Sequence, residues 1–323
     1  MTLRVVELFS GVGTQRMALR NLGIDHEVVA MCEIDKYAIQ SYEAIHGATK
    51  NLGDITQVDP TTLDDFDLLT YSFPCQSLSA AGKQEGLIRG KTRSGLLYEC
   101  EKIIEAKKPR FLLLENVKAL VGTKFKPQFD EWLAYLESLG YTNYWQVLNA
   151  KDYGIPQSRE RVFVVSILGE HEPYEFPKPI PLTKCVADYE DKNATKRAVS
   201  PLLLPYFDEK YFRPSLSNKG LLKLFDGVVF GYFDTSFEAR RIYSTQGATP
   251  TLTTKGAVPI FYEFGGTLTA LERWRLMGMS DEDYFKAKNS GVSEAQLTKQ
   301  AGNAIVVNVL EAIFRELFLN EVE

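Results

Sequence analysis

The first half of the chain alternates short apolar segments with amphipathic ones, and this alternation restricts the fold more than any other feature. The apolar runs have the length of buried strands, and the segments between them carry apolar residues at helical three- and four-residue spacing. The expected strands are 3–9, 27–32, 67–73, 110–114, 145–148 and 161–167, and the expected helices are 17–22, 36–45, 95–106 and one through 129–136 that ends before Gly140. Strands that alternate with helices form parallel sheets, so the sequence predicts an α/β protein with a doubly wound, mostly parallel sheet.

Composition and periodicity change after residue 172. The stretch 172–181 is dense in proline and has no period, which indicates a linker, and the next ninety or so residues are rich in aromatic residues, Gly and Thr. Helical patterning returns after Thr267 and ends in an apolar face from Val306 to Leu317. We therefore predict a first domain at 1–172, a small irregular β-rich domain at 173–265, and a C-terminal segment at 266–323 whose last helix returns to the first domain.

Composition excludes several classes of protein. No apolar run among the 323 residues reaches the roughly 18 that a membrane helix needs, and the N-terminus lacks the pattern of a signal peptide, so we expect a cytoplasmic protein. The four cysteines show no CxxC pair and the three histidines no metal motif, so we expect neither disulfides nor a metal. The net charge is −5, but segment 173–265 holds 12 Lys and Arg against 10 Asp and Glu, so nucleic-acid binding stays open.

A glycine-containing loop follows the first expected strand. Phe9-Ser10-Gly11-Val12-Gly13 opens the next helix, where a backbone without side chains can approach a ligand, although the third glycine of GxGxxG is missing and a tight turn without a ligand is the alternative. Glu33 ends the second strand about twenty residues later, at the position that binds ribose hydroxyls in such folds, and Asp54 follows near the next strand. Together these residues favour a cofactor that contains a nucleoside.

Two further strands end in polar residues that could carry chemistry. Cys75 follows the strand at 67–73, and Glu115 follows the strand at 110–114, so both are expected at the carboxyl edge of the sheet, where open sheets bind ligands. Cys75 is then a candidate nucleophile, and the alternative is a small buried apolar residue. Glu115 can equally cap a helix. Arg159 and Arg161 alternate on entry to a further strand, which surface ion pairs would also explain.

Five motifs occur together in a fixed order. They are Phe9-Ser10-Gly11-Val12-Gly13, Pro74-Cys75-Gln76, Glu115-Asn116-Val117, Gln157-x-Arg159-x-Arg161 and Gly302-Asn303-Ala304. In these motifs and their spacing the chain resembles the bacterial and phage DNA (cytosine-5) methyltransferases. The resemblance covers 3–168 and 267–317, and between them it matches at Thr251-Leu252. It implies a Rossmann-like, S-adenosylmethionine-dependent methyltransferase domain and a target-recognition domain at 173–265.

The resemblance also implies a mechanism. Cys75 matches a thiolate that adds to carbon 6 of cytosine, which activates carbon 5 toward the methyl group of S-adenosylmethionine. Glu115 would hold a proton on ring nitrogen 3 and Arg161 would bind the carbonyl oxygen, with Asn116 and Arg159 in the same catalytic set. Because a paired base cannot reach such a pocket, the cytosine must rotate out of the duplex at a cost of roughly a few kcal/mol.

Cofactor and DNA contacts follow from the same resemblance. The residues that match the family's cofactor site are Phe9, Gly11, Val12, Gly13, Glu33, Ile34, Asp54, Ile55, Pro74, Leu97, Asn303 and Ala304. Those that match its contacts with double-stranded DNA are Gln76, Ser79, Lys83, Arg89, Gln157, Thr251 and Leu252. The segment 76–92 resembles the loop that closes over DNA. A single active site on an asymmetric substrate suggests a monomer, and a cognate restriction endonuclease can accompany such enzymes.

The chain departs from the family pattern in two places, and three alternative assignments make different predictions about the sequence. The family's Arg-x-Leu-Thr-Pro-Arg-Glu element is Gly266-Thr-Leu-Thr-Ala-Leu-Glu272 here, which leaves open how the recognition domain is anchored, and Ile34 replaces a frequent tryptophan. A transfer-RNA cytosine methyltransferase would carry a Cys-Phe-Thr element, which this sequence lacks. A nicotinamide oxidoreductase would leave Cys75 and Glu115 unexplained, and an inactive DNA-binding module predicts loss of Cys75.

Overall fold

The computed structural model divides the chain into two compact units. It describes residues 2–78, 85–194, 199, 203–226, 241–254 and 259–319. The first unit comprises Met1–Leu148, Glu160–Lys178 and Val309–Glu323, and the second comprises Asn149–Arg159 and Pro179–Asn308. These bounds differ from those of the three segments expected from the sequence, whose division stays a prediction.

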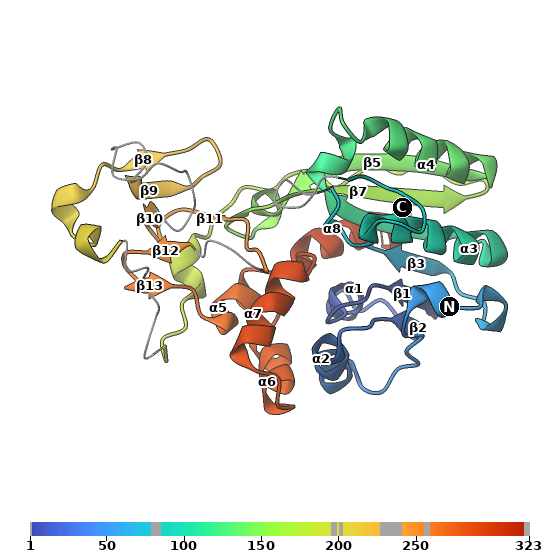
Figure 1. Cartoon of the computed structure of the whole chain (residues 1–323), viewed down its shortest axis with the longest axis horizontal. Coiled ribbons are helices and arrows are strands. Elements are labelled where there is room, and N and C mark those ends of the chain that lie inside the picture. The colour runs from blue at the N-terminus through green and yellow to red at the C-terminus, as the bar shows by residue number, and fades with distance from the viewer. Residues whose placement is uncertain are drawn as a thin grey trace. The chain divides into compact units, whose positions relative to one another are not determined.

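A six-stranded sheet forms the centre of the first unit (Figure 1). Its strands are β1 (Leu3–Leu8), β2 (His26–Cys32), β3 (Leu68–Tyr71), β4 (Phe111–Val117), β5 (Tyr141–Asn149) and β7 (Glu160–Leu168), in the order β2-β1-β3-β4-β7-β5. β1 pairs in parallel with β2 and β3, and β3 with β4, whereas β4 and β7 are antiparallel, from Phe111 opposite Ile167 to Val117 opposite Arg161. The mostly parallel α/β sheet is thereby confirmed.

Burial explains why the strands of this sheet could be predicted from the sequence. All four residues of β3 are buried, as are the last four of β1, because parallel strands in the middle of an α/β sheet are covered on both faces. These strands therefore appear as continuous apolar runs. The buried exceptions in these two strands are Glu7 of β1, a fully buried carboxyl group, and Thr70 of β3.

Helices lie between the strands of the first unit along the chain, and one further helix, near the C-terminus, enters this unit at Val309. They are α1 (Thr14–Asn21), α2 (Lys36–His46), α3 (Leu97–Lys107), α4 (Lys126–Ser138) and α8 (Val307–Phe318), with short 3-10 turns η1 (Ile55–Gln57), η2 (Pro60–Thr62), η3 (Arg93–Leu96) and η4 (Lys118–Val121). Asp35 caps α2 by accepting from the backbone N–H of Tyr37 and Ala38. At the end of α8, the ring of Phe318 contacts Phe111 edge-on, with 5.2 Å between centroids.

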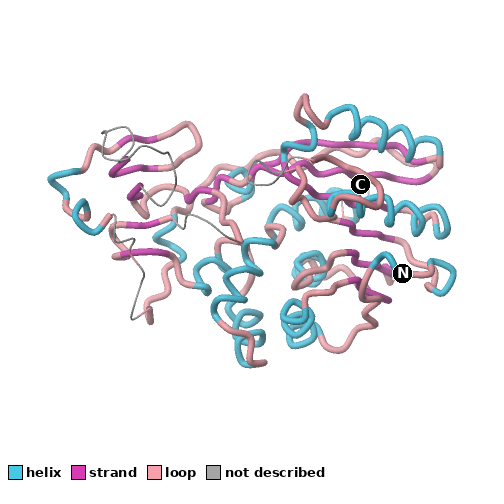
Figure 2. Tube along the Cα trace, viewed as in Figure 1, coloured by secondary structure: helices cyan, strands magenta, loops and turns pink. Residues whose placement is uncertain are grey.

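The second unit is built from shorter strands joined by long loops (Figure 2). One sheet has the order β13-β12-β10-β9-β8, and a two-stranded sheet pairs β6 with β11. The strands are β6 (Gln157–Ser158), β8 (Ser215–Leu216), β9 (Leu222–Asp226), β10 (Arg241–Tyr243), β11 (Thr249–Pro250), β12 (Ile260–Phe261) and β13 (Gly266–Thr267). The short turns are η5 (Ala150–Tyr153), η6 (Val186–Tyr189), η7 (Leu204–Tyr206) and η8 (Glu209–Tyr211), and the helices are α5 (Ala270–Arg275), α6 (Asp281–Asn289) and α7 (Glu294–Asn303). A buried cluster that includes Tyr243, Leu252 and Phe261 forms a core of this unit.

Candidate active site

The loop between β1 and α1 has three residues with positive φ and leaves open space beside its backbone for a ligand. Phe9, Gly11 and Gly13 all have positive φ, at 56°, 56° and 76°. A Cβ on Gly13 would lie 2.6 Å from both His46 and the ring of Tyr42, so this position excludes any side chain. A Cβ on Gly11 would meet nothing within 4 Å, which leaves open space beside the backbone. Gly13 is therefore required for packing, and Gly11 faces a space that a ligand can use.

Glu33 joins the end of β2 to this loop. Its Oε2 accepts the Gly11 N–H at 2.9 Å, and its Oε1 accepts the N–H groups of Ile34 and Asp35 at 2.8 Å each. A carboxylate has about four acceptor positions, so one on Oε2 remains for a further donor such as a ribose hydroxyl. Ile34, another of the residues expected at the cofactor site, is 72% exposed.

The remaining predicted cofactor residues lie in different surroundings. Asp54 is exposed and caps η1 through its Oδ1, whereas the side chains of Ile55 and Leu97 are buried in the core of the first unit. Pro74 is half-buried at the end of the β3 loop. The structure thus brings Phe9, Gly11, Val12, Gly13 and Glu33 together. Asn303 and Ala304 belong to the second unit, so their predicted contact with the cofactor stays a prediction.

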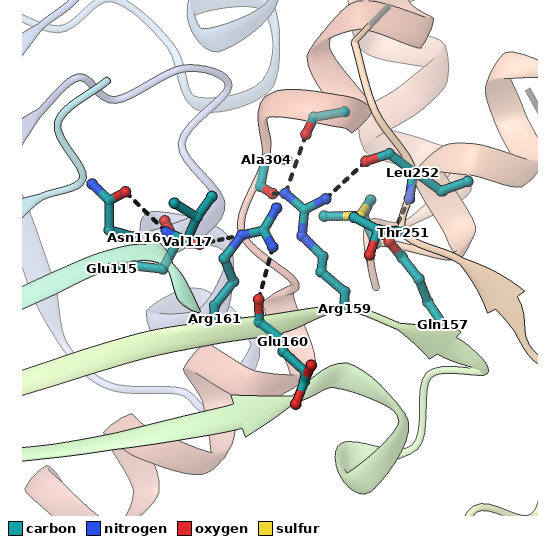
Figure 3. Close-up of polar contacts among 12 residues, drawn as sticks. Glu115, Asn116, Val117, Gln157, Arg159, Glu160, Arg161, Thr251, Leu252 and Ala304 are labelled. Carbon is teal, nitrogen blue, oxygen red and sulfur yellow. Dashed lines mark hydrogen bonds and ion pairs between the residues drawn. The ribbon is translucent and has the colours of Figure 1, made fainter. Parts of the chain in front are cut away.

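Glu115 and Arg161 form an ion pair across two neighbouring strands. The distance from Arg161 Nε to Glu115 Oε1 is 3.1 Å, and the side chains are 18% and 11% exposed respectively (Figure 3). Arg161 also donates from Nη1 to the Glu160 carbonyl at 2.8 Å. β4 extends to Val117, further than the sequence predicted, so Glu115 lies within the strand and not after it. The antiparallel pairing of β4 with β7 brings these two predicted catalytic residues together.

Asn116 links β4 to the segment that carries Cys75. Its Nδ2 donates to the Phe73 carbonyl at 3.0 Å, and its Oδ1 accepts the Val117 N–H at 2.9 Å. Cys75 itself is half-buried, and its carbonyl accepts the Leu78 N–H at 2.9 Å. The chain therefore turns directly after Cys75, and Asn116 fixes this segment to the end of β4.

The four cysteines differ in their capacity to react. Burial raises the pKa of the Cys32 thiol to about 12, and burial raises the pKa of Cys100 well above its usual value. Because the thiolate is the nucleophile, neither of these two can serve at neutral pH. Cys75 and Cys185 are half-buried, and Cys185 lies in the second unit, where its N–H donates to Asp188. Within the first unit, Cys75 is thus the candidate nucleophile.

Arg159 and Gln157 have structural contacts within the second unit. Arg159 is buried and donates to the carbonyls of Leu252, Gly302 and Ala304 at 2.9, 3.1 and 2.9 Å (Figure 3). Gln157 is fully buried: its Nε2 donates to the Leu276 carbonyl at 2.8 Å, and its Oε1 accepts the Leu252 N–H at 3.0 Å. No pattern in the sequence predicts these contacts. Their predicted catalytic and DNA-binding roles stay predictions.

The other predicted DNA contacts belong to both units of the chain. Gln76 is exposed and accepts from Arg93, and the Arg89 guanidinium donates twice to Glu101. In the second unit, Thr251 donates to the Ser158 carbonyl at 2.6 Å, and Leu252 is buried in the core. Ser79 and Lys83 lie outside the described residues.

The segment 266–272 departs from the family pattern, and residues other than the family's arginines attach it to its neighbours. Thr269 and Glu272 form a capping box at the start of α5, and the second carboxyl oxygen of Glu272 accepts the Asp191 N–H at 2.8 Å. Arg275 donates to the Glu190 carbonyl and pairs with both oxygens of Asp281 at 2.7 Å. Glu272 and Arg275 therefore attach residues 190–191 to α5. Sequence reasoning missed Arg275, although Thr-x-x-Glu was a readable capping signal.

Two classes of site are absent from the part of the chain that the structure describes. These residues contain no group of three or more His, Cys, Asp or Glu side chains placed to hold a metal ion. Within the same residues, no helix has the length and apolar character needed to cross a membrane.

Comparisons with known proteins show the family to which the chain belongs. The "Type II methyltransferase M2.ScrFI" of Lactococcus lactis subsp. cremoris is 38% identical over 99% of this chain and 100% of that protein. The "Type II methyltransferase M.HhaI" of Haemophilus parahaemolyticus is 34% identical over 96% and 93% respectively. The "Orphan methyltransferase M.SPBetaI" of Bacillus phage SPbeta is 31% identical over 98% and 97%.

Solved structures share the fold at lower identity. The S. pombe Dnmt2 methyltransferase superimposes with a TM-score of 0.70 at 20% identity, covering 98% of both chains. The Entamoeba histolytica methyltransferase EhMeth gives 0.71 at 17% identity over 100% of both chains. The family profile described as "C-5 cytosine-specific DNA methylase" matches residues 3–319. The chain therefore belongs to the C-5 cytosine-specific DNA methylases, a family of DNA-methylating enzymes.

Proposed function

We propose that this enzyme transfers a methyl group from S-adenosylmethionine to carbon 5 of a cytosine in double-stranded DNA, with Cys75 as a covalent nucleophile. The observation that carries the proposal is the arrangement at the end of β4. Asn116 holds the Cys75 segment through Phe73, and the preceding residue, Glu115, is paired with Arg161. A nucleophile, a carboxyl group and a fixed cation are thereby attached to the end of one strand.

Each of these side chains answers a requirement of the reaction. Carbon 5 of cytosine is a poor nucleophile, so the Cys75 sulfur first forms a bond to carbon 6, and the electron pair of the 5,6 double bond becomes available at carbon 5. Glu115 keeps a proton on ring nitrogen 3, and Arg161 donates to the carbonyl oxygen. Attack of carbon 5 on the methyl group would release S-adenosylhomocysteine. A base then removes the proton at carbon 5, its electron pair re-forms the 5,6 double bond, and Cys75 leaves as the thiolate.

The residues around Gly11 fit S-adenosylmethionine, which supplies the methyl group when bound. The open space beside Gly11 admits a ligand, and the remaining acceptor position on Glu33 suits a ribose hydroxyl. The exposed Ile34 offers an apolar surface for a purine ring. Asp54 is exposed and therefore accessible to an amino group. These contacts bind and orient; none requires a metal ligand.

The DNA substrate must present its cytosine outside the helix. A paired base is shielded by its neighbours, so base rotation at a cost of roughly a few kcal/mol precedes the chemistry. The segment 76–92 adjoins Cys75 and carries Gln76 and Arg89, which we place against the DNA, together with Thr251 of the second unit. A single such site can act on one strand at a time, so we infer a monomer, and the type II relatives make a cognate restriction endonuclease a reasonable partner to seek.

The deciding experiment measures methyl transfer from labelled S-adenosylmethionine to unmethylated duplex DNA and to transfer RNA in parallel, followed by bisulfite sequencing of the DNA. We expect 5-methylcytosine within one short sequence motif. Label confined to RNA would replace DNA as the substrate, and label in neither would support the inactive-module alternative.

Cys75→Ser tests the nucleophile in the same assay. Serine keeps the size of the side chain but does not ionise at neutral pH, so turnover should be lost while cofactor binding, measured by calorimetry, is retained. Cys185→Ser, which changes the other half-buried thiol, is the matched control and should retain activity. Substantial methylation by a pure Cys75→Ser preparation would refute the covalent mechanism.

A further inference from the structure

A buried serine bridges the two sides of Cys75. Ser94, in η3, is fully buried. Its hydroxyl donates to the Pro74 carbonyl at 2.6 Å and accepts the Ser77 N–H at 3.3 Å. One side chain thus holds the residue immediately before Cys75 and the residue two positions after it.

We propose that Ser94 is a positioning residue for Cys75. The inference rests on the proposed function, which makes Cys75 the nucleophile. Its hydroxyl fixes the backbone on both sides of the thiol, and so sets the direction in which the sulfur approaches the cytosine ring. Nucleophilic attack requires the reacting atoms to lie about 3–3.5 Å apart and aligned, so that a displacement of about 1 Å can lower the rate by roughly 100-fold.

Ser94 itself has a fixed position, which a bridging residue requires. The neighbouring Thr92 side chain donates to the Gly86 carbonyl at 2.9 Å and accepts the N–H of Ile88 at 3.1 Å. Gly95 packs so closely that a Cβ there would lie 2.1 Å from the Ile88 carbonyl oxygen. The segment 86–95 is therefore a tight, internally bonded turn, and Ser94 transmits its position to the Cys75 segment.

The other ties of the Cys75 segment leave this role to Ser94. Asn116 holds Phe73, before the turn, and Gly86 donates to the Ser77 carbonyl at 3.0 Å, after it. Arg93 donates to Gln76 at 3.1 Å, also after Cys75. None of these three contacts joins the two sides of Cys75. Loss of the Ser94 hydroxyl would leave the Pro74 carbonyl and the Ser77 N–H without this partner in a buried place, and the turn would shift to recover hydrogen bonds.

The test compares Ser94→Ala with Ser166→Ala. Ser166 is an equally buried serine of the same unit whose hydroxyl donates to Asn143 at 2.7 Å, away from the Cys75 segment. Both substitutions remove one buried hydroxyl and should lower thermal stability to a similar extent. We expect Ser94→Ala to reduce the single-turnover rate of methyl transfer by roughly 10- to 100-fold with a nearly unchanged Kd for duplex DNA, and Ser166→Ala to leave that rate within about twofold of the wild type.

A second readout is independent of methyl transfer. The rate at which iodoacetamide alkylates Cys75, followed by peptide mass spectrometry across pH, should show a changed pH profile in Ser94→Ala and the wild-type profile in Ser166→Ala. Ser94→Thr keeps the hydroxyl and should recover part of the single-turnover rate. If Ser94→Ala does not fold, Ser94→Cys, which keeps the volume but weakens both hydrogen bonds, takes its place in both measurements.

Two results would overturn the assignment of Ser94: a wild-type rate and alkylation profile in the folded variant, or an equal loss of rate in Ser166→Ala. Failure of the proposed function is recognised separately, because it would appear as methylation by Cys75→Ser or as no methylation by the wild-type enzyme.

Discussion

Glu7 is a fully buried carboxyl group, and its burial opposes ionisation. It accepts hydrogen bonds from the Tyr42 hydroxyl at 2.6 Å and from the Arg16 N–H at 3.1 Å, and thereby joins β1 to α1 and α2. Burial raises the pKa of Glu7 to about 7, although the bond from Tyr42 and the charge of Arg16 oppose the shift. The nearby His46 ring nitrogen lies 3.1 Å from the Val12 carbonyl of the glycine loop.

This raised pKa predicts a pH-dependent stability. An acid whose pKa is higher in the folded than in the unfolded state binds more protons when folded, so its contribution is complete below about pH 4.5 and is lost as the pH rises through 7. Glu7→Gln cannot titrate. Between pH 5 and pH 8.5, the free energy of unfolding of the wild type should therefore fall relative to that of Glu7→Gln by roughly 2–3 kcal/mol. Urea unfolding at the two pH values measures this difference, and a constant difference would contradict the raised pKa.

Glu115 and Arg161 form the pair on which the proposed chemistry depends. Glu115→Gln keeps the shape but loses the negative charge that orients Arg161, and it cannot exchange a proton with the cytosine ring. We expect the single-turnover rate to fall by about 100-fold or more, in the range of general acid–base catalysis. Glu160→Gln is the matched control, because Glu160 is paired at the surface with Lys118 and should tolerate the change. A wild-type rate in Glu115→Gln would remove Glu115 from this role.

At the scale of single residues, the sequence indicated the candidate reactive residues better than the residues that hold them in position. Cys75, Glu115 and Glu33 were recognisable because the sequence places each at or just beyond the carboxyl end of an apolar run, at the edge where open sheets bind ligands. The contacts of Ser94 and Arg159 with backbone carbonyls were not recognisable. They depend on which residues meet across 20 to 145 positions of sequence. Spacing carries no information about such contacts.

Among the elements, α5 shows how a short helix can be fixed without the arginines that the family pattern led us to expect. Glu272 is fully buried, caps the helix with one carboxyl oxygen, and accepts the Asp191 N–H with the other. Thr269→Ala removes one cap contact and should cost about 1 kcal/mol of stability. Glu272→Ala removes both contacts of the carboxylate and leaves the half-buried N–H groups of Asp191 and Thr269 without this acceptor, so it should cost about 2–3 kcal/mol. Chemical unfolding measures both values, and equal effects would show that the Asp191 contact contributes nothing.

The predictability of an element depended on its length and its burial. The strands of the first unit were predicted because continuous apolar runs of several residues stand out, although β4 was predicted too short: its end is polar and is held by pairing with β7. The antiparallel direction of β7 depends on where the preceding connection crosses the sheet, which no local pattern records. Strands of two residues, such as β8, β11 and β12, are shorter than any detectable period.

For the whole molecule, the division into two units follows contacts rather than composition. The proline-dense stretch at 172–181 marks a change of composition, whereas the contact boundaries fall at Leu148, Arg159, Lys178 and Asn308. The chain thus leaves the first unit twice. Arg159 illustrates why: it precedes β7 by one residue, yet its guanidinium binds carbonyl groups more than ninety residues away in sequence. The composition and net charge of a segment do not depend on which residues contact one another, so they cannot predict where such a unit begins or ends.

The net charge of −5 requires that DNA binding depend on a few local cations, and this makes a prediction about salt. Arg89 is one candidate: its side chain is 56% exposed, and its ion pair with Glu101 is worth at most about 1 kcal/mol, so a phosphate can replace that carboxylate. Each phosphate contact contributes about 0.9 to the slope of log Kd against log salt concentration. Arg89→Ala should therefore reduce this slope by about 1 and weaken binding equally for cognate and unrelated duplexes.

Arg110→Ala provides the comparison for that measurement. Arg110 is also exposed, but it immediately precedes β4, at the opposite end of the strand from Glu115, where a bound duplex would not reach it. The slope of log Kd against log salt concentration for Arg110→Ala should therefore equal that of the wild type. Equal slopes for all three proteins would mean that Arg89 keeps its contact with Glu101 in the complex. The cations that offset the net negative charge would then have to be sought elsewhere in the chain, with the basic residues of 173–265 as the next group to substitute.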